Sequence, residues 1–504
     1  MFRQVLVGLV SSATLLSSGM TLGFPGIIIP QLTKEPENLS QDEISWFESM
    51  NSIAGILGCL TCGPLLDAFG RRRTLLLVNV PLIVGWLTYF MTPTPSPIYL
   101  LYIARVLNGF GGGMASVPAR VYCGEMVNKT LRSILMTWPS ISGSLGTLIM
   151  YFLSWLIQDS WHLVAGISAI FPVVTVVLVF AVIQESPTWL LKKGRRAEAE
   201  ASFKWIRNLR SDEEMTDVMR REFDAIVQFV EKFKTSEKTN KQMSREAELR
   251  ANPPHEAQSQ FERLGASLSA PDIWKPLLII NIYFLFMQFS GIASVIFYSV
   301  DVMSKAGVSM DPYLATVIVG AINLVVGSAA NVAHHRFGRR TMSLWSGALM
   351  TVSFVVIGLY VQTVGRTEPN STHLTWIPLA LILFYVAAAS IGIYVVPWAM
   401  LGEVFPVRIK GLASGLSTCL AYAFQFASVK VYPSFVNMFE SDKSHNSYEG
   451  LFYLYGSISC TATLFVLFFL PETFKKSLDE ISDEFMKSRT CQLQCCSQSA
   501  NDDV

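Results

Sequence analysis

Charged residues are scarce in this chain, and this scarcity narrows the possible classes of protein. Only 15% of the 504 residues are Asp, Glu, Lys or Arg, whereas 51% are hydrophobic. A soluble domain carries about 25% charged residues, so the composition indicates an integral membrane protein. The net charge is only +1, which gives no general attraction for a polyanion. We therefore expect no nucleic-acid partner.

The sequence also lacks the motifs on which enzymes and metalloproteins depend. No activated nucleophile, metal-ligand set, Walker loop or dinucleotide fingerprint stands out. The glycines between Gly109 and Gly113 lie inside an apolar run rather than after a strand. We therefore expect no enzymatic activity, no catalytic residue, no metal site and no cofactor.

Long apolar runs, in contrast, are abundant. Twelve runs are long enough to cross a hydrocarbon layer of about 30 Å as helices. They lie near residues 5–29, 46–66, 74–91, 98–121, 133–157, 163–183, 275–299, 312–333, 341–362, 375–400, 411–436 and 450–470. The sequence therefore predicts an all-α polytopic membrane protein with twelve transmembrane helices.

A short basic turn occurs twice and indicates a duplication. Phe69-Gly70-Arg71-Arg72 and Phe337-Gly338-Arg339-Arg340 each lie between long apolar runs. Charged residues follow both turns in the same order: Glu125, Arg132 and Glu185 after the first, and Glu403, Lys410 and Glu472 after the second. A repeat of about half the chain predicts two pseudo-symmetric halves of six helices each.

The polar segments divide the chain further. Residues 1–191 and 275–470 form the predicted halves, and residues 471–504 form a tail. Between the halves, residues 192–274 carry apolar side chains at helical spacing amid charges, which predicts amphipathic helices in a linker. These apolar residues are Met215, Met219, Phe223, Ile226, Val230 and Phe233.

Basic residues of the short loops gather on one side of the predicted topology. Both basic turns fall on that side, so the positive-inside rule predicts that both termini and the linker are cytoplasmic. Glycosylation sequons begin at Asn38 and Asn370, in loops assigned to the opposite side. We predict a glycosylated protein of the plasma membrane.

Duplicated halves with charges at their cytoplasmic helix ends favour a secondary carrier over a pore. Six motifs stand out along the chain: Asp67-Ala68-Phe69-Gly70-Arg71-Arg72, Pro118-Ala119-Arg120-Val121-Tyr122, Glu185-Ser186-Pro187, Gln288-Phe289-Ser290-Gly291, Pro397-Trp398 and Pro471-Glu472-Thr473. Together they resemble the sugar porter family of the major facilitator superfamily, and within it the insect facilitated trehalose and hexose carriers.

The resemblance implies a cytoplasmic charge network that latches the closed state. Its carboxylates and guanidiniums would form charge-assisted hydrogen bonds when the cytoplasmic side is shut and would rehydrate when it opens. The members are Arg71, Arg72, Glu125, Arg132, Glu185, Arg339, Arg340, Glu403, Lys410 and Glu472.

The resemblance also implies a sugar site built from amides and aromatic rings. The residues expected to bind substrate are Gln288, Asn323, Trp398, Ser140 and Tyr298. Several polar positions of glucose carriers have changed. Met287, Ala293 and Ser140 stand where those carriers have amides, Ser390 replaces a glutamate, and Ala421-Tyr422 replaces an Asn-Trp pair. Each lost hydrogen bond is worth about 0.5–1.5 kcal/mol, so either the substrate differs or other groups substitute. We predict trehalose or a hexose.

Coupling is predicted from helix one. Proton symport in this family uses a carboxylate there; Thr21 stands at that position, although its arginine partner, Arg105, is present. We expect no Asp or Glu in the membrane interior of the first six spans, and hence facilitated (uniport) transport of the sugar across the lipid bilayer. A proton-coupled sugar or polyol symporter and a transporter-like nutrient receptor are the alternatives, and the oligomeric state is left open.

Overall fold

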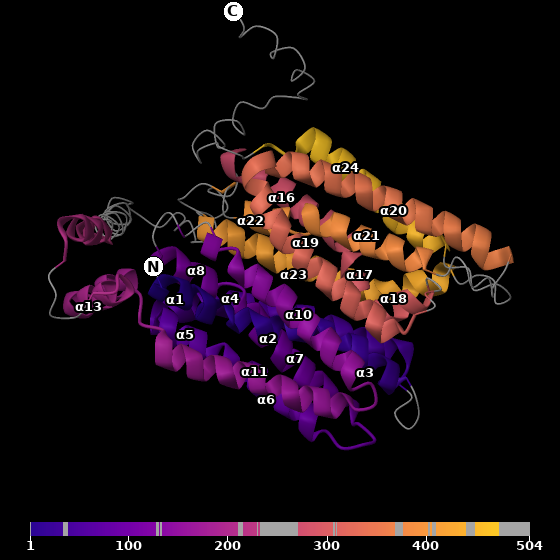
Figure 1. Ribbon diagram of the computed structural model, residues 1–504, viewed down its shortest axis with the longest axis horizontal. Helices are drawn as coiled ribbons and strands as arrows, with labels where there is room; N and C mark the ends of the chain where they lie inside the picture. The colour runs from indigo at the N-terminus through magenta and orange to yellow at the C-terminus, as the bar shows by residue number, and fades with distance from the viewer. Residues whose placement is uncertain are drawn as a thin grey trace, which may run out of the picture. The chain divides into compact units, whose positions relative to one another are not determined.

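The computed structural model describes residues 2–33, 39–127, 131, 134–209, 215–228, 230–231, 271–305, 308, 310–367, 376–401, 404–405, 410–439 and 449–472. These residues form helices and connecting turns, with no strand among them. The chain divides into two compact units, unit 1 (Met1–Gly265) and unit 2 (Ala266–Val504) (Figure 1). Their boundary falls within the predicted linker, 192–274.

Unit 1 has helices over all six of its predicted spans, and two shorter helices follow them. The bounds are α1 (Phe2–Ser12), α2 (Thr14–Gly23), α3 (Pro25–Leu32), α4 (Gln41–Phe69), α5 (Arg71–Leu77), α6 (Asn79–Met91), α7 (Ile98–Ala115), α8 (Pro118–Met126), α10 (Trp138–Leu156), α11 (Trp161–Val182), α12 (Pro187–Lys192) and α13 (Arg196–Ile206). The first span is therefore three short helices, with breaks at Ala13 and Phe24.

Unit 2 likewise has helices over its six predicted spans. The bounds are α16 (Pro271–Phe289), α17 (Ile292–Phe297), α18 (Ser299–Lys305), α19 (Pro312–Phe337), α20 (Arg339–Thr367), α21 (Ile377–Ile391), α22 (Val396–Met400), α23 (Lys410–Phe439) and α24 (Glu449–Phe469). Its first span is also interrupted, where Ser290 and Gly291 separate α16 from α17.

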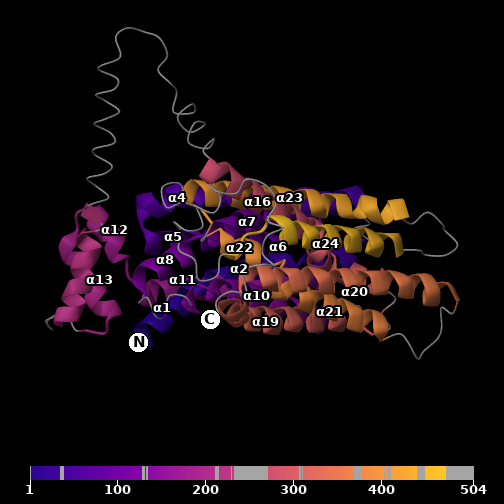
Figure 2. The same ribbon diagram turned by 90° about the horizontal axis from the view of Figure 1, so that it is seen from above.

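Both units pair their helices in the same pattern. In unit 1, α4 packs along α7, α2 along α10, and α6 against both α7 and α11. In unit 2, α19 packs along α21, α16 along α23, and α20 against both α21 and α24 (Figure 2). Each pair in unit 2 joins the spans that correspond in chain order to a pair in unit 1. The repeat in the sequence is therefore a repeat in the structure.

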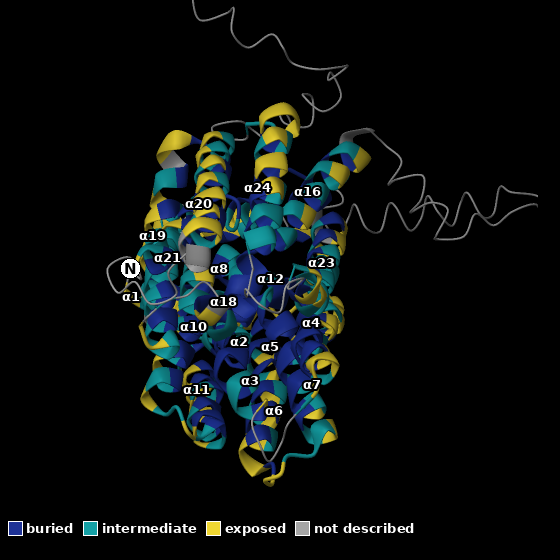
Figure 3. Cartoon of the chain, turned by 90° about the vertical axis from the view of Figure 1, so that its right-hand side faces the viewer, coloured by how far each residue is buried: buried dark blue, intermediate teal, exposed yellow. Residues whose placement is uncertain are grey.

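Nine helices within the described ranges are long and apolar enough to cross a membrane. Three predicted spans are not among these nine, because their helices are too short or too polar. The span at 98–121 carries Arg105 and Asn108 and breaks after Ala115, α10 is rich in serine and glycine, and α16 ends at Phe289. Exposed residues line the outer turns of α20 and α24 (Figure 3), and many of them are large and apolar, such as Leu464 and Phe468. Such faces suit contact with lipid.

The linker helices pack on unit 1 through a small hydrophobic cluster. Trp189 and Leu190 of α12, Phe203 of α13, and Phe223 and Val230 are all buried in it. Met215, Met219 and Ile226 pack against the same cluster, and residues 217–228 are helical. Phe233 lies outside the described residues. The apolar face of this segment is thus covered by α12 and α13.

Candidate functional site

The basic turn of unit 1 depends on a glycine that lies against a carboxylate. Gly70 joins α4 to α5 with φ of 90°, a backbone conformation that other residues rarely adopt. A Cβ atom at this position would collide with Glu185 Oε2. Only glycine therefore lets the turn and this carboxylate approach so closely.

Glu185 caps the start of α5. Its Oε1 accepts hydrogen bonds from the backbone N–H groups of Arg71 at 2.7 Å, Arg72 at 3.3 Å and Ser186 at 3.0 Å. The first N–H groups of a helix have no partner within the helix and carry partial positive charge. Glu185 was predicted as a partner in a side-chain network, whereas its described contacts with the turn are to the backbone.

The Arg71 side chain forms the buried ion pair of this turn. Its guanidinium donates from Nε to Glu125 Oε2 at 3.0 Å and from Nη2 to Glu125 Oε1 at 2.7 Å. Nη1 donates to the Leu66 carbonyl at 3.1 Å and lies 3.7 Å from Asp67 Oδ1. The Arg71 and Glu125 side chains are only 5% and 18% exposed. The fork geometry makes this a strong, directional pair.

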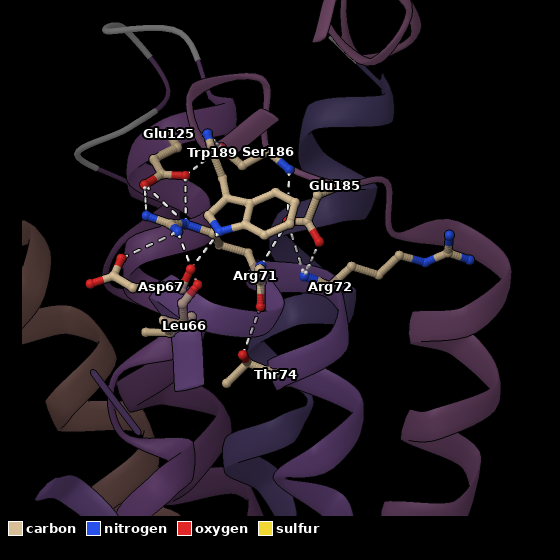
Figure 4. Close-up of polar contacts among 10 residues, drawn as sticks. Leu66, Asp67, Arg71, Arg72, Thr74, Glu125, Glu185, Ser186 and Trp189 are labelled. Atoms are coloured by element: carbon tan, nitrogen blue, oxygen red, sulfur yellow. Dashed lines mark hydrogen bonds and ion pairs between the residues drawn. The ribbon is translucent and has the colours of Figure 1, made fainter. Parts of the chain in front are cut away.

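Residues after α11 complete the cluster, which Figure 4 shows in close-up. The Ser186 hydroxyl donates to Glu125 Oε2. Trp189 Nε1 donates to the Asp67 carbonyl at 3.1 Å. The Arg72 side chain points away from Glu125 (Figure 4), and its Nη2 donates to the Phe180 carbonyl at 2.8 Å. Two neighbouring arginines therefore have different roles, one pairing a carboxylate and the other binding the end of α11.

Unit 2 repeats the backbone part of this arrangement. Gly338, with φ of 81°, lies where a Cβ atom would come within 2.7 Å of Glu472 Oε2. Glu472 accepts from the N–H groups of Arg339 at 3.0 Å and Arg340 at 3.2 Å. Arg340 Nη2 donates to the Leu467 carbonyl at 2.6 Å, as Arg72 does to Phe180. Arg132 and Glu403 lie outside the described residues, as does the side chain of Lys410, the first residue of α23.

Two predicted substrate residues of unit 2 use their amides within the protein. Gln288 is 3% exposed, and its Nε2 lies 3.4 Å from the Ala421 carbonyl of α23. The Asn323 amide oxygen accepts from the Ser390 hydroxyl of α21 at 2.9 Å. Ser390 was noted in the sequence only as a lost carboxylate, and it holds the amide of Asn323 instead.

The predicted aromatic residues belong to two groups of rings. Trp398 of α22 packs edge-on against Phe284, with ring centroids 4.8 Å apart, and lies 6.4 Å from the ring of Tyr422. Phe284 precedes Gln288 by one turn of α16, so Trp398 and Gln288 lie on contacting elements. Tyr298 instead stacks on Tyr432 at 4.3 Å and is 6% exposed.

In unit 1, Ser140 of α10 is exposed and contacts a residue that was not predicted to bind substrate. Arg120 of α8 donates from Nη2 to the Ser140 hydroxyl at 3.2 Å and from Nη1 to the Ser116 carbonyl at 2.5 Å. Arg120 was read in the sequence only as part of a family-like motif. The sequence carries no signal for this contact, because it joins two helices whose packing only the folded chain sets.

One carboxylate lies within the first six predicted spans. Glu48 lies in α4, inside the span predicted at 46–66, and is fully buried. Its place near the start of the span made it easy to assign to the membrane surface. The predicted glycosylation sites, Asn38 and Asn370, lie outside the described residues.

Comparison with known proteins agrees with this architecture. The family model described as "Sugar (and other) transporter" matches residues 30–485. The chain belongs to the sugar transporter family. The transporter is 31% identical to the facilitated trehalose transporter Tret1 of Polypedilum vanderplanki over 89% of this chain and 80% of that protein. It is 29% identical to Tret1 of Aedes aegypti over 88% of this chain, and it spans only 50% of that relative's length.

The fold is confirmed by a solved structure. The transporter superposes on the inward open conformation of the xylose transporter XylE from E. coli with a TM-score of 0.72, covering 95% of this chain and 99% of that one at 21% identity. The predicted all-α fold of the major facilitator superfamily is therefore correct, and so is the prediction of an integral membrane protein that is not an enzyme.

Proposed function

We propose that the transporter carries trehalose or a hexose across the plasma membrane by alternating access, down the gradient of the sugar. The observation that carries this proposal is the glycine turn capped by a carboxylate, Gly70 with Glu185 and Gly338 with Glu472, at matching places in two units with the same helix pairing. Two similar bodies with charged clusters at corresponding ends suit a carrier whose halves rock about a central substrate.

The substrate class is supported by the relatives and by the residues available for binding. Two relatives are facilitated trehalose transporters. Gln288, Asn323, Trp398, Ser140 and Tyr298 are proposed to bind the sugar, which requires the two amides to exchange their internal hydrogen bonds for hydroxyls of the substrate. The guanidinium of Arg120 adds charged hydrogen-bond donors beside Ser140. These donors would replace part of the hydrogen bonding that amide side chains supply in glucose carriers.

Uniport is supported by the surroundings of Arg105. This arginine is fully buried, and its Nη1 donates to the backbone carbonyl of Thr21 at 2.8 Å, where the resemblance implies a carboxylate side chain in symporters. The alternative of proton-coupled transport is favoured by one observation, the buried carboxylate of Glu48. A receptor that binds sugar without moving it is the third possibility.

Tracer uptake into proteoliposomes tests the three possibilities. Trehalose, glucose, fructose and myo-inositol are supplied at pH 5.5 and 7.5, with and without unlabelled sugar inside. We expect equilibration without accumulation, acceleration by internal sugar, and the same rate at both pH values. Accumulation driven by a proton gradient would favour the symporter, and binding without acceleration would favour the receptor. Either result would contradict the proposed uniport.

Arg120 gives a sharper test of the sugar site. Arg120→Gln should raise KM about tenfold or more, because a hydrogen bond from a charged donor is worth about 1.5–3 kcal/mol. Arg120→Lys keeps the charge but loses the fork and should recover only part of the affinity. Arg196→Gln, on an exposed linker residue, is the control. An unchanged KM in Arg120→Gln would remove Arg120 from the site.

Orientation is proposed from the basic turns and the sequons. Both termini, the charge network and the linker are placed in the cytoplasm, and Asn38 and Asn370 outside. Asn38→Gln and Asn370→Gln should each reduce the mass lost on glycosidase treatment of protein from eukaryotic cells. Glycans at neither position would contradict this orientation.

A further inference from the structure

Unit 1 buries two oppositely charged side chains inside its helices. Glu48 of α4 and Arg105 of α7 are both 0% exposed. A charge within a membrane span is costly unless an opposite charge or several hydrogen-bonding groups compensate it. Each of these residues therefore needs a partner that the surrounding helices supply.

The packing of α4 on α7 sets the level of each residue. A Cβ atom added to Gly109 of α7 would collide with the carbonyl oxygen of Asn51 in α4. A Cβ atom added to Gly113 would collide in the same way with the carbonyl oxygen of Gly55. The two helices therefore run in the same direction along their contact. Glu48 lies three residues before Asn51, and Arg105 lies four residues before Gly109. One turn back from this close contact, the two charged residues are level.

Contacts of the Arg105 guanidinium agree with this register. Nε donates to the carbonyl of Phe47, the neighbour of Glu48, at 3.3 Å. The guanidinium carbon also lies 5.2 Å from the centroid of the Phe47 ring. Arg105 thus reaches across to the turn of α4 that carries Glu48.

The surroundings of this turn are mostly aromatic. Phe24, Phe47, Trp86 and Tyr89 are buried and pack on one another, and Tyr89 lies beside Arg105. The first turn of α4 carries Asp42 and Glu43, and Tyr102 of α7 donates to the Glu43 carbonyl. Rings therefore lie beside Arg105, and both charges are closed off from water.

We infer that Glu48 is the fixed counter-ion of Arg105, so that unit 1 keeps this arginine neutralised without binding a proton. Both residues belong to one compact unit, and the close backbone contact between α4 and α7 resists their separation. An ion pair that stays together throughout the cycle contributes no proton to transport. This inference explains how the proposed uniport can hold a buried arginine without a carboxylate in helix one, and it rests on that proposed function only for its transport test.

Thermal unfolding of the purified full-length chain tests the pairing without any substrate. Glu48→Gln should lower Tm by about 10 °C, because breaking a buried pair leaves one charge uncompensated. Glu48→Gln combined with Arg105→Gln removes both charges and should recover much of the loss. Glu48→Asp keeps the charge and should lose less than Glu48→Gln. Asp42→Asn, in the exposed first turn of α4, is the matched control and should leave Tm nearly unchanged.

Two results would overturn the pairing. One is a Tm for Glu48→Gln equal to that of the parent chain. The other is a double variant less stable than both single variants, since two independent residues would simply add their losses. If Glu48→Gln does not fold at all, Glu48→Asp and the double variant still decide the question.

Sugar uptake with an imposed proton gradient tests whether Glu48 stays ionised beside Arg105 during transport. Uptake by the parent chain and by Glu48→Asp should show the same flat profile between pH 5.5 and 7.5. Uptake that is driven by protons in the parent chain, and no longer in Glu48→Gln, would make Glu48 a proton site and overturn the inference. If the parent chain carries neither trehalose nor a hexose, the proposed function fails, while the unfolding test of the pair stands separately.

Discussion

The two basic turns share the capping glutamate and the contact of the second arginine, and they differ in the residue three positions before the glycine. Glu185 and Glu472 both cap the helix that follows the glycine, and Arg72 and Arg340 both bind a carbonyl five residues before the capping glutamate. In the first turn, Asp67 lies 3.7 Å from Arg71. The corresponding residue of the second turn is His335, so that turn has no carboxylate at this position.

This comparison separates a local requirement from one that depends on distant elements. A turn that enters a helix through a glycine with positive φ exposes backbone N–H groups, and a carboxylate from the end of the sixth helix of the unit satisfies them. The partner of the Arg71 side chain comes from a third element, α8. The cap therefore needs only the turn and the end of the sixth helix, whereas the ion pair of Arg71 also depends on the packing of α8.

Removing the ion pair should have the largest effect and should act on the first turn alone. Glu125→Gln leaves the buried Arg71 guanidinium without its carboxylate, so we expect a loss of about 3–5 kcal/mol in the free energy of unfolding. Denaturation in detergent measures it. Asp67→Asn is the matched control on the same arginine; Asp67 is 77% exposed, so its loss should be below about 1 kcal/mol. Equal losses in the two variants would contradict the ranking of these partners.

Removing the caps should have a smaller effect and should act on both turns. Glu185→Ala and Glu472→Ala each lose charged hydrogen bonds to two helix N–H groups, for which we expect about 3 kcal/mol. Glu185 also accepts from Ser186, so its variant should be the less stable of the two. The Gln variants retain an acceptor oxygen and should lose less. If only one of the two Ala variants were destabilised, the two glutamates would not be equivalent caps.

Replacing the glycines should have the smallest effect on stability, and the losses in the two turns should be nearly equal. Gly70→Ala and Gly338→Ala introduce a Cβ atom at positive φ and against a carboxylate oxygen, so we expect a loss of about 1–2 kcal/mol in each. Combining each with the Ala variant of its own capping glutamate removes the collision, and the double variant should then lose less than the sum. Strict additivity would show that strain in the backbone, rather than the carboxylate, makes glycine necessary.

The sequence predicts the fold well because the membrane makes its pattern simple. Twelve apolar runs and two basic turns lead to the helices and the repeat that the structure contains. The breaks at Ala13 and Phe24 are not visible in hydropathy, because no charged residue lies beside either of them. Helix ends set by a charged neighbour, such as Gly70, are found more easily.

The candidate site is predicted less well, because a residue type does not reveal its partner. Glu185 was expected to meet arginine side chains and binds backbone N–H groups. Gln288 and Asn323 have the predicted chemistry, yet their amides contact Ala421 and Ser390. Glu48 and Arg120 were missed because their importance depends on which helix lies opposite, and helix pairing is a property of the folded chain.

The attachment of α13 to α1 has a consequence for dividing the protein into fragments. Arg3 donates to the Trp205 carbonyl at 2.8 Å and its guanidinium lies over the Trp205 ring, while Ile206 is buried among residues of α1, α5 and α11. A chain cut between residues 231 and 271 would therefore leave the linker helices with the first fragment. If the two fragments are expressed separately, each should retain its own hydrophobic core. The carrier could then be reassembled by combining them.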